Sequence, residues 1–398
     1  MAKLVEITGK ALSGEWGTDD ETGDGIPILR TTNFTNEGVV DYKDVVTRTI
    51  TKKNIDEKYL RSGDIIIEKS GGSDKQPVGR VIYFDGPEKT YLFNNFTGLL
   101  RVKNQEAWFP KYVFYSLYGN YRRGGTRPFE NKTTGLHNLK TDDYVSRYEV
   151  AETDYKKQVE VCEHLDRLYN VIKLREEEIQ KLDDLIKARF VEMFGDPISN
   201  SLGSKMLPMT DVCEIIDGDR GKNYPTQEEF NEKGYCLFLN AKNVTNVGFN
   251  FDNCMFITKQ KDEILRKGKL CRGDVVLTTR GTIGNMAYYT EKIPFEHIRI
   301  NSGMVILRMK HEIINEVFFI EQFKMQIANI KSKIASGSAQ PQLPISTMNR
   351  IHILIPDINS QNQFADFVNQ VHKSKVEIQQ ALEKTQLLFD SLMQQYFG

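Results

Sequence analysis

Cysteine is scarce in this sequence, and the few cysteines lie far apart. The five are Cys162, Cys213, Cys236, Cys254 and Cys271, with no Cys-x-x-Cys pair among them. Disulfide-bonded small domains and zinc ribbons depend on closely spaced cysteines, so the sequence favours neither. We therefore expect a reducing, cytoplasmic setting.

Long apolar runs are also missing. Residues 1–14 lack the apolar core of a signal peptide, and no stretch approaches the roughly 18 apolar residues that a membrane span requires. We therefore expect no membrane partner. The 398 residues are enough for two or three domains, each with its own core.

A basic excess is absent too, because 53 Lys and Arg face 54 Asp and Glu. This balance alone argues against a nucleic-acid-binding protein. The basic residues are nevertheless unevenly distributed. Segments 107–129 and 322–356 each contain four Lys or Arg and no Asp or Glu. One such cluster can arise by chance on a solvated surface, but two at matching places are harder to attribute to chance.

Motifs of catalysis are absent as well. The sequence has no G-x-x-x-x-G-K-[ST] phosphate loop and no Asn-Pro-Pro-aromatic tetrapeptide of adenine methyltransferases. Asp-x-Lys occurs at 41–43 and 56–58, but neither has the preceding Pro-Asp of metal-dependent nucleases. The six histidines form no His-x-x-x-His pair. We expect no catalytic site, no metal site and no cofactor on this chain.

The sequence contains an internal duplication. Asn-Phe-Thr-Asn-Glu-Gly at 33–38 returns 210 residues later as Asn-Val-Thr-Asn-Val-Gly at 243–248, and Gly-Asp-Ile-Ile-Ile at 63–67 returns at the same offset as Gly-Asp-Val-Val-Leu. Residues 78–84 match 283–289 at an offset of 205, and 98–102 resemble the stretch around 303–308. A period this long indicates two copies of a domain, with one loop five residues shorter in the second copy.

Each copy continues in the same way. Helical segments at 110–121 and about 313–334 precede polar loops, Gly-Gly-Thr-Arg-Pro at 124–128 and Ser-Gly-Ser-Ala-Gln-Pro at 336–341. Each half then ends in a long segment without Pro or Gly that stops at Phe-Gly, where glycine is typical of a helix end.

Apolar residues recur about every seven positions in both long segments, which predicts coiled-coil packing. At about 1.5 Å per residue, nearly 40 residues span roughly 55 to 60 Å, more than the width of a domain of this size. Ordinary amphipathic helices on a globular core are the simpler explanation, but helices of this length must pack on each other or on a partner. The expected packing residues are Leu165, Ile172, Ile179, Ile186, Phe364, Val371, Ile378 and Leu388.

These observations predict two homologous domains that are separated by two long antiparallel coiled-coil helices. The first helix carries the chain from one module to the other, and the second returns, giving pseudo-two-fold symmetry. The expected divisions are 1–152, 153–196, 197–357 and 358–398.

The chain as a whole resembles the specificity subunits of Type I restriction-modification systems. The resemblance covers essentially its full length and includes the opening Asp-Val-Cys-Glu-Ile-Ile-Asp-Gly at 211–218, the repeat at 273–277 and the loop at 336–341. The first copy departs from the pattern in having Gly-Gly-Thr-Arg-Pro in place of that loop.

The resemblance implies target-recognition modules of mixed α/β (α+β) fold, similar to the DNA-recognition domain of adenine methyltransferases. Its implied partners are double-stranded DNA, two methyltransferase subunits and, for restriction, motor-nuclease subunits. S-adenosylmethionine, ATP and Mg would then belong to the partner subunits, since the methyltransferase flips an adenine out of the duplex and the motor hydrolyses ATP.

Candidate DNA-binding residues follow from groove chemistry. Arg and Lys suit guanine, Asn and Gln suit adenine, and Lys, Arg and hydroxyls suit phosphates. Plain turn chemistry selects many of the same residues. In the first half the candidates are Arg30, Thr31, Asn33, Lys69, Ser70, Gly71, Lys75, Arg122, Arg123 and Arg127. In the second they are Asn240, Lys242, Thr279, Arg280, Thr282, Lys331, Lys333, Ser338 and Gln340.

Two other functions are compatible with parts of the pattern. A coiled-coil scaffold that never meets DNA would explain the heptads and the neutral charge, but not the basic segments at equivalent places. A nuclease or methyltransferase with unfamiliar motifs would be exposed by assaying the chain with S-adenosylmethionine, and with Mg and ATP.

Overall fold

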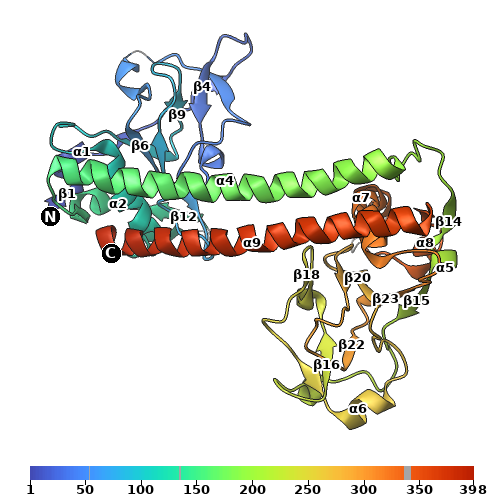
Figure 1. Ribbon diagram of the computed structural model, residues 1–398. Coiled ribbons are helices and arrows are strands. Elements are labelled where there is room, and N and C mark those ends of the chain that lie inside the picture. Colours follow the sequence, from blue (N-terminus) through green and yellow to red (C-terminus); the bar gives the residue numbers. More distant parts are fainter. Residues whose placement is uncertain (53, 134–135, 336–341) are drawn as a thin grey trace. The chain divides into compact units, whose positions relative to one another are not determined.

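The computed structural model describes residues 1–52, 54–133, 136–335 and 342–398 and divides into two compact units (Figure 1). Unit 1 comprises Met1–Glu176 and Gln380–Gly398, and unit 2 comprises Glu177–Gln379. Two 40-residue helices, α4 (Tyr155–Phe194) and α9 (Ile358–Phe397), contain the points where the chain passes between the units. Each unit therefore contains part of both long helices.

Unit 1 is built on a four-stranded antiparallel sheet whose central strand is buried on both faces. The strand order is β2 (Leu12–Ser13), β10 (Thr97–Leu100), β6 (Asp64–Glu68) and β8 (Val81–Phe84). In β6, Ile65 and Ile67 join the core beneath the helices, whereas Ile66 joins a second cluster with Leu29 and Phe93. Alternate side chains of a strand point to opposite faces, so a strand covered on both sides reads as an unbroken apolar run.

The second cluster of unit 1 lies against a further sheet. Its order is β3 (Thr18–Asp19), β5 (Val46–Thr49), β4 (Ile26–Leu29) and β9 (Leu92–Phe93), with β4 and β9 parallel. The remaining strands are β7 (Ser70–Gly72), β11 (Glu130–Thr133) and β12 (Leu136–Leu139) in one sheet and β1 (Ala2–Lys3) with β13 (Glu149–Val150) in another. The helices are α1 (Leu4–Thr8), α2 (Pro110–Arg122) and α3 (Thr141–Arg147), with 3-10 turns at η1 (Thr31–Asn33), η2 (Asp56–Lys58) and η3 (Arg127–Phe129).

Unit 2 repeats the main features of this topology. Its four-stranded sheet has the order β15 (Cys213–Asp217), β23 (Met304–Met309), β20 (Val275–Thr278) and β21 (Met286–Tyr288). A parallel pair, β16 (Cys236–Leu239) and β22 (Ile298–Ile300), corresponds to β4 and β9 of unit 1. The duplication expected from the sequence is therefore present in the strand order of both units.

The other elements of unit 2 complete the same plan. They are β14 (Met206–Pro208) with β24 (His352–Leu354), β17 (Val244–Thr245) with β18 (Gly248–Phe249), and β19 (Phe256–Ile257) beside β16. The helical segments are α5 (Met209–Val212), α6 (Lys259–Ile264), α7 (Glu316–Ala335), α8 (Ile345–Met348), η4 (Gln227–Glu229) and η5 (Ala241–Asn243). No helix within the described ranges is both long and apolar enough to cross a membrane.

A buried ion pair occupies the same place in both main sheets. Arg101 contacts the Asp64 carboxylate through Nε and Nη2, each at 2.7 Å, and Arg308 contacts Asp274 in the same way at 2.9 Å. Both carboxylates are 1% exposed. Removing the arginine would leave the buried carboxylate charge uncompensated, so each pair links neighbouring strands.

A buried glutamine ties the first turn of each long helix to its unit. Gln158 of α4 accepts from the Phe109 amide at 2.9 Å and donates to the carbonyls of Ala107 and Thr153 at 3.0 Å. Gln361 of α9 does the same with Asn315 N at 2.9 Å, Ile313 O at 3.0 Å and Pro356 O at 2.9 Å. The two side chains are 1% and 0% exposed, so each helix start is fixed by an equivalent internal lock.

The long helices contribute apolar side chains to both units. In unit 1, Leu165 and Ile172 of α4 lie in the same core as Phe389 and Met393 of α9. In unit 2, Phe190 and Phe194 pack with Phe364 at 5.4 and 5.7 Å between ring centroids. Helix α2 in unit 1 and helix α7 in unit 2 complete the core around these side chains.

Not all of the expected packing residues are buried. Leu165, Ile172, Ile186, Phe364 and Val371 are buried, whereas Ile179 and Ile378 are half-buried.

Leu388 differs from the expectation, because it is 50% exposed and the next residue, Phe389, is 4% exposed. The buried positions around it, Thr385, Phe389 and Met393, are spaced by four residues. A helix with 3.6 residues per turn drifts from a strict seven-residue repeat, and here the drift moves the apolar face by one position.

Candidate nucleic-acid interface

The turns η1 and η5 are built around equivalent buried asparagines. Asn33 Oδ1 accepts from Arg30 N at 2.9 Å, and Asn243 Oδ1 accepts from Asn240 N at the same distance. The Nδ2 groups donate to carbonyls of the following loop, Asp41 O in the case of Asn33. Asn33 is 1% exposed, so the sequence-based assignment of this residue to DNA contact is corrected: its amide is used within the turn.

Each of these turns is fastened to the neighbouring hairpin by one side chain. In unit 1, Arg80 donates through Nη1 to Phe34 O at 2.8 Å and through Nη2 to Thr31 O at 2.9 Å. In unit 2, Asn285 Nδ2 donates to Val244 O at 3.0 Å. Sequence reasoning aligned these two positions in the repeat but assigned them no role.

In unit 2 several predicted residues converge on the loop between β20 and β21. Arg280 and Thr282 are exposed in this loop, and the Arg280 side chain makes no ion pair within the described part of the chain. Lys331 of α7 lies beside the same loop, because its Cε would be 3.5 Å from a Cβ added at Gly284. Lys242 of η5 is exposed, and the Asn285 contact with Val244 joins η5 to this hairpin.

Other predictions in unit 2 have a different outcome. Thr279 is 5% exposed and its hydroxyl donates to Gly303 O at 3.0 Å, which corrects its assignment as a DNA contact. Asn240 is half-buried, and its side chain accepts from Lys242 N. Lys333 belongs to α7. Ser338 and Gln340 lie outside the described residues.

In unit 1 the predicted loop after β6 forms a strand. Ser70 and Gly71 belong to β7, which pairs with β12, and Lys69 O accepts from Leu139 N at 2.8 Å. Lys69 Nζ donates to Ser13 Oγ at 3.0 Å, and burial lowers the pKa of Lys69 below its usual value. Lys75 is exposed, and Arg30 and Thr31 are half-buried. The basic tip of this hairpin is therefore Lys75, with Lys69 partly withdrawn.

The basic residues after α2 are largely engaged inside unit 1. Arg122 forms an ion pair with Asp390 of α9 at 2.8 Å, and Arg123 donates to Phe397 O. Both arginines are exposed, so their assignment as DNA contacts stays a prediction, although each already has a partner on α9. Arg127 in η3 remains exposed.

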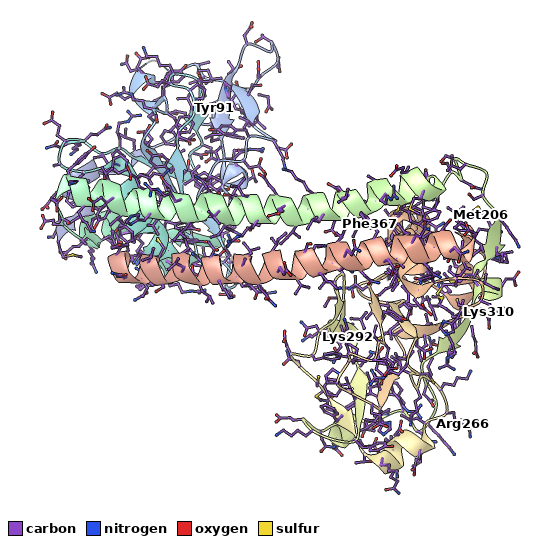
Figure 2. The ribbon with its side chains drawn as sticks, in the orientation of Figure 1. Tyr91, Met206, Arg266, Lys292, Lys310 and Phe367 are labelled. Carbon is purple, nitrogen blue, oxygen red and sulfur yellow. The ribbon has the colours of Figure 1, made fainter. Side chains whose placement is uncertain are left out.

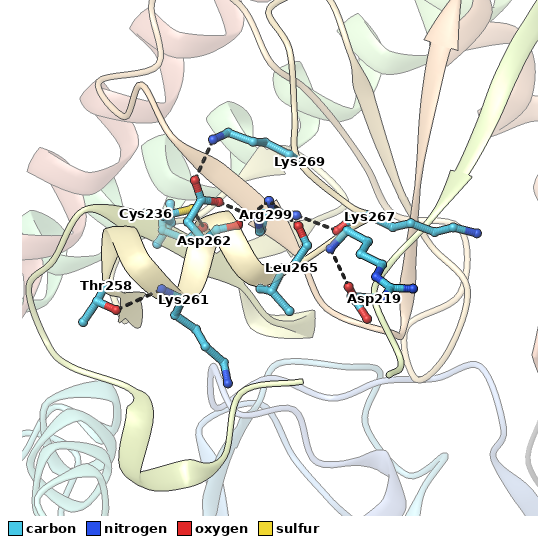
Figure 3. A network of polar contacts seen from close by, with 11 residues as sticks. Asp219, Cys236, Thr258, Lys261, Asp262, Leu265, Lys267, Lys269 and Arg299 are labelled. Carbon is cyan, nitrogen blue, oxygen red and sulfur yellow. Dashed lines mark hydrogen bonds and ion pairs between the residues drawn. The ribbon is translucent and has the colours of Figure 1, made fainter. Parts of the chain in front are cut away.

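Unit 2 also has a polar network without an equivalent among the described contacts of unit 1 (Figure 3). Arg299 contacts Asp262 at 2.5 Å and donates to the carbonyls of Asp262, Leu265 and Lys267 at 2.7 to 3.0 Å. Burial alone would raise the pKa of Asp262, but hydrogen bonds from Lys269 and Arg299 lower it below its usual value.

This network fixes the end of α6 and the loop that follows it. Asp219 accepts from the Arg266 amide at 2.8 Å, so the backbone of the loop is held from two sides. Arg266 itself is exposed on the outer side of unit 2 (Figure 2).

The comparisons with known proteins agree with the sequence resemblance. The family model described as "Type I restriction modification DNA specificity domain" matches residues 203–387. This segment is a Type I restriction-modification DNA specificity domain. The family expected from the sequence is therefore confirmed for residues 203–387, which contain the η5 turn, the β20–β21 loop and α7 described above. No curated protein matches the chain.

Solved structures extend the similarity to the whole chain. The S subunit of a Type I restriction-modification system from M. genitalium is 18% identical, with a TM-score of 0.56, and the match covers 100% of this chain and 95% of that one. A chain from a structural study of complex assembly and conformational transition of the type I R-M system is 15% identical, with the same TM-score, and covers 100% and 96%. These likenesses concern the fold, a mixed α/β architecture with the long helix α4.

Within the described ranges no group of three or more His, Cys, Asp or Glu side chains is placed to hold a metal ion. The exposed functional groups around the β20–β21 loop are cations, hydroxyls and backbone amides, which suit contact with phosphates and base edges.

Proposed function

We propose that this chain is the sequence-reading subunit of a Type I restriction-modification complex and that it is not itself an enzyme. Each unit would read one half of a bipartite, asymmetric DNA site and direct adenine methyltransferase and restriction subunits to it. The observation that carries the proposal is that the two units share the strand order of the main sheet and equivalent glutamine locks, while their exposed loops differ. Such a design keeps the framework constant and changes the sequence that is read.

The proposed layout has two target-recognition domains, 1–152 and 197–357, and two spacer helices, 153–196 and 358–398. We infer that the helices run antiparallel and give the subunit pseudo-two-fold symmetry. Equivalent glutamine locks at the two helix starts support this symmetry. Two-fold proteins read paired half-sites at a spacing fixed by the protein, so the helices would set the distance between the half-sites.

Exposed apolar side chains on the long helices support the proposal that partner subunits bind there. Leu174 and Leu185 of α4 are 63% and 46% exposed, and Val376 and Leu387 of α9 are 55% and 70% exposed. Exposed apolar surface is typical of protein interfaces. Two methyltransferase subunits and the motor-nuclease subunits would bind there, bringing S-adenosylmethionine, ATP and Mg with them.

In unit 2 the exposed Arg280 is the best placed of the described candidates to contact a base edge. A guanidinium can bind guanine O6 and N7 through two hydrogen bonds. Lys242 and Lys331 would contact phosphates, because a lysine carries a point charge on a flexible stem and reads no sequence by itself.

The test is methylation by the chain reconstituted with its partner adenine methyltransferase, with modified sites mapped by sequencing. The expected site has two parts, and replacing residues 1–152 by the equivalent module of a relative changes one part only. The chain alone should neither methylate DNA nor cleave it with Mg and ATP. Simultaneous change of both parts, or turnover by the isolated chain, contradicts the proposal. Binding of the partner without any sequence choice would indicate a scaffold instead.

A further inference from the structure

Arg80 and Asn285 occupy the same point in the two units. Each follows a glycine with positive φ, +102° at Gly79 and +91° at Gly284. The backbone carbonyl of each residue also accepts a hydrogen bond from the preceding strand of the hairpin. The donor is Glu68 N at 2.8 Å for Arg80 and Thr278 N at 2.9 Å for Asn285. Their backbones are therefore equivalent, although their side chains have nothing in common beyond an N–H donor.

Both side chains direct that donor to the same target. Arg80 reaches Phe34 O and Asn285 reaches Val244 O, the first residues after η1 and η5. Each contact thus joins two segments that are distant in sequence and that carry candidate DNA-contacting residues. In unit 2 these segments are the η5 turn with Lys242 and the loop with Arg280.

The two braces differ in strength. Among the described residues the Asn285 side chain makes one hydrogen bond, whereas Arg80 also donates to Thr31 O and to the Glu68 carboxylate at 3.3 Å. The Glu68 side chain is 4% exposed, and burial raises its pKa while Arg80 opposes the rise. Unit 1 therefore holds its turn with a forked, charge-assisted contact, and unit 2 with a single amide.

We propose that Arg80 and Asn285 are positioning residues, each of which sets the sequence choice of one half-site by fixing the turn relative to the hairpin. The proposal rests on the proposed function and adds the residues that make each reading surface rigid. Base readout requires donors held within about 0.5 Å of their productive position. Without the brace, the turn and the hairpin shift independently and wrong bases are tolerated.

The test in unit 2 is Asn285→Asp, which keeps the size of the side chain and removes the donor. The reconstituted complex is assayed on the cognate site and on substrates with one mismatch in either half. We expect methylation of substrates mismatched in the half read by unit 2 to rise about ten-fold relative to the cognate site. Discrimination in the other half should stay unchanged.

In unit 1 the plain substitution Arg80→Ala would leave Glu68 buried and unpaired and could unfold the unit. The double variant Arg80→Met with Glu68→Gln removes the brace and the buried charge together. This double variant should relax discrimination only in the half-site that unit 1 reads. Arg80→Lys retains a charged donor group opposite Glu68, so it should keep more of the discrimination than the double variant does.

Asn231→Asp is the matched control, because it makes the same amide-to-acid change at an exposed position of unit 2 outside the brace. It should leave both half-sites unchanged. A merely structural role for Asn285 would lower the melting temperature and slow all substrates alike, with their relative rates preserved. That result, or equal relaxation of both halves, overturns the proposal. Failure of the wild-type complex to show a bipartite site would instead contradict the proposed function.

Discussion

The glutamine locks at the starts of α4 and α9 allow a quantitative prediction. Gln361→Ala removes one acceptor and two donated hydrogen bonds from a side chain that is 0% exposed. Each such bond contributes about 1 kcal/mol net, so the expected loss of unfolding free energy is about 2 to 4 kcal/mol. In a unit of roughly 200 residues, 1 kcal/mol corresponds to about 2 to 4 °C, which gives a fall of very roughly 5 to 15 °C in its melting temperature.

Calorimetry combined with amide hydrogen exchange measures this effect. Exchange should accelerate around residues 313–361 in the Gln361→Ala variant and around 107–158 in the Gln158→Ala variant, because the locks belong to different units. Gln180→Ala is the control, since Gln180 is exposed on α4 and its side chain donates to the exposed Asp184 at 3.2 Å. This substitution should change the free energy of unfolding by less than about 0.5 kcal/mol. A loss below about 1 kcal/mol for Gln361→Ala would show that the carbonyls and the amide find other partners, and the reasoning would fail.

Further predictions concern DNA reading and the spacer helices. Arg280→Ala should cost about 1 to 3 kcal/mol and relax choice at one base position, whereas equal weakening on all sequences would indicate a phosphate contact. If the Arg122–Asp390 pair is structural, Asp390→Arg should restore the DNA binding that Arg122→Asp weakens. If Arg122 instead contacts a phosphate, the slope of log binding constant against log salt concentration should fall by about one, and Asp390→Arg should not restore binding. Inserting one heptad after Ile179 and one after Ile378 lengthens the helices by roughly 10 Å, which equals about three base pairs at 3.4 Å each. On DNA substrates that differ only in spacer length, methylation should therefore be lost at the original optimal spacer and recover only partly on longer spacers. An unchanged optimum would mean that the helices do not set the spacing.

The features that depend on local pattern could be predicted from the sequence. The heptads and the terminal Phe-Gly pairs predicted long helices that end at Phe194 and Phe397, and in the structure α4 and α9 end at these residues. The repeated Gly-Asp and β-branched run located β6 and β20, because a strand buried on both faces needs an unbroken apolar stretch.

The site was less predictable because burial decides the role of polar residues. Asn33 and Thr279 have the composition of DNA-contacting loops, yet each is enclosed and bonded to backbone. Turn formation and base readout select the same residue types, so the sequence alone does not separate them. Arg122 illustrates a second cause, since its partner Asp390 lies 268 residues further along the chain. The sequence therefore does not show which basic residues are paired with an acidic residue from a distant segment.

The composition of unit 1 has a consequence for how the chain is made. Phe389, Met393 and Phe397 belong to its core, but they are synthesised after the whole of unit 2. At about 5 to 20 residues per second, translation of the roughly 200 intervening residues takes on the order of 10 to 40 seconds. During that time the nascent first unit leaves the apolar faces of α2 and α4 uncovered, whereas unit 2 is complete as soon as residue 379 emerges. The unit that is translated first therefore finishes folding last, and it is the one exposed to chaperones and to aggregation while the ribosome is still at work.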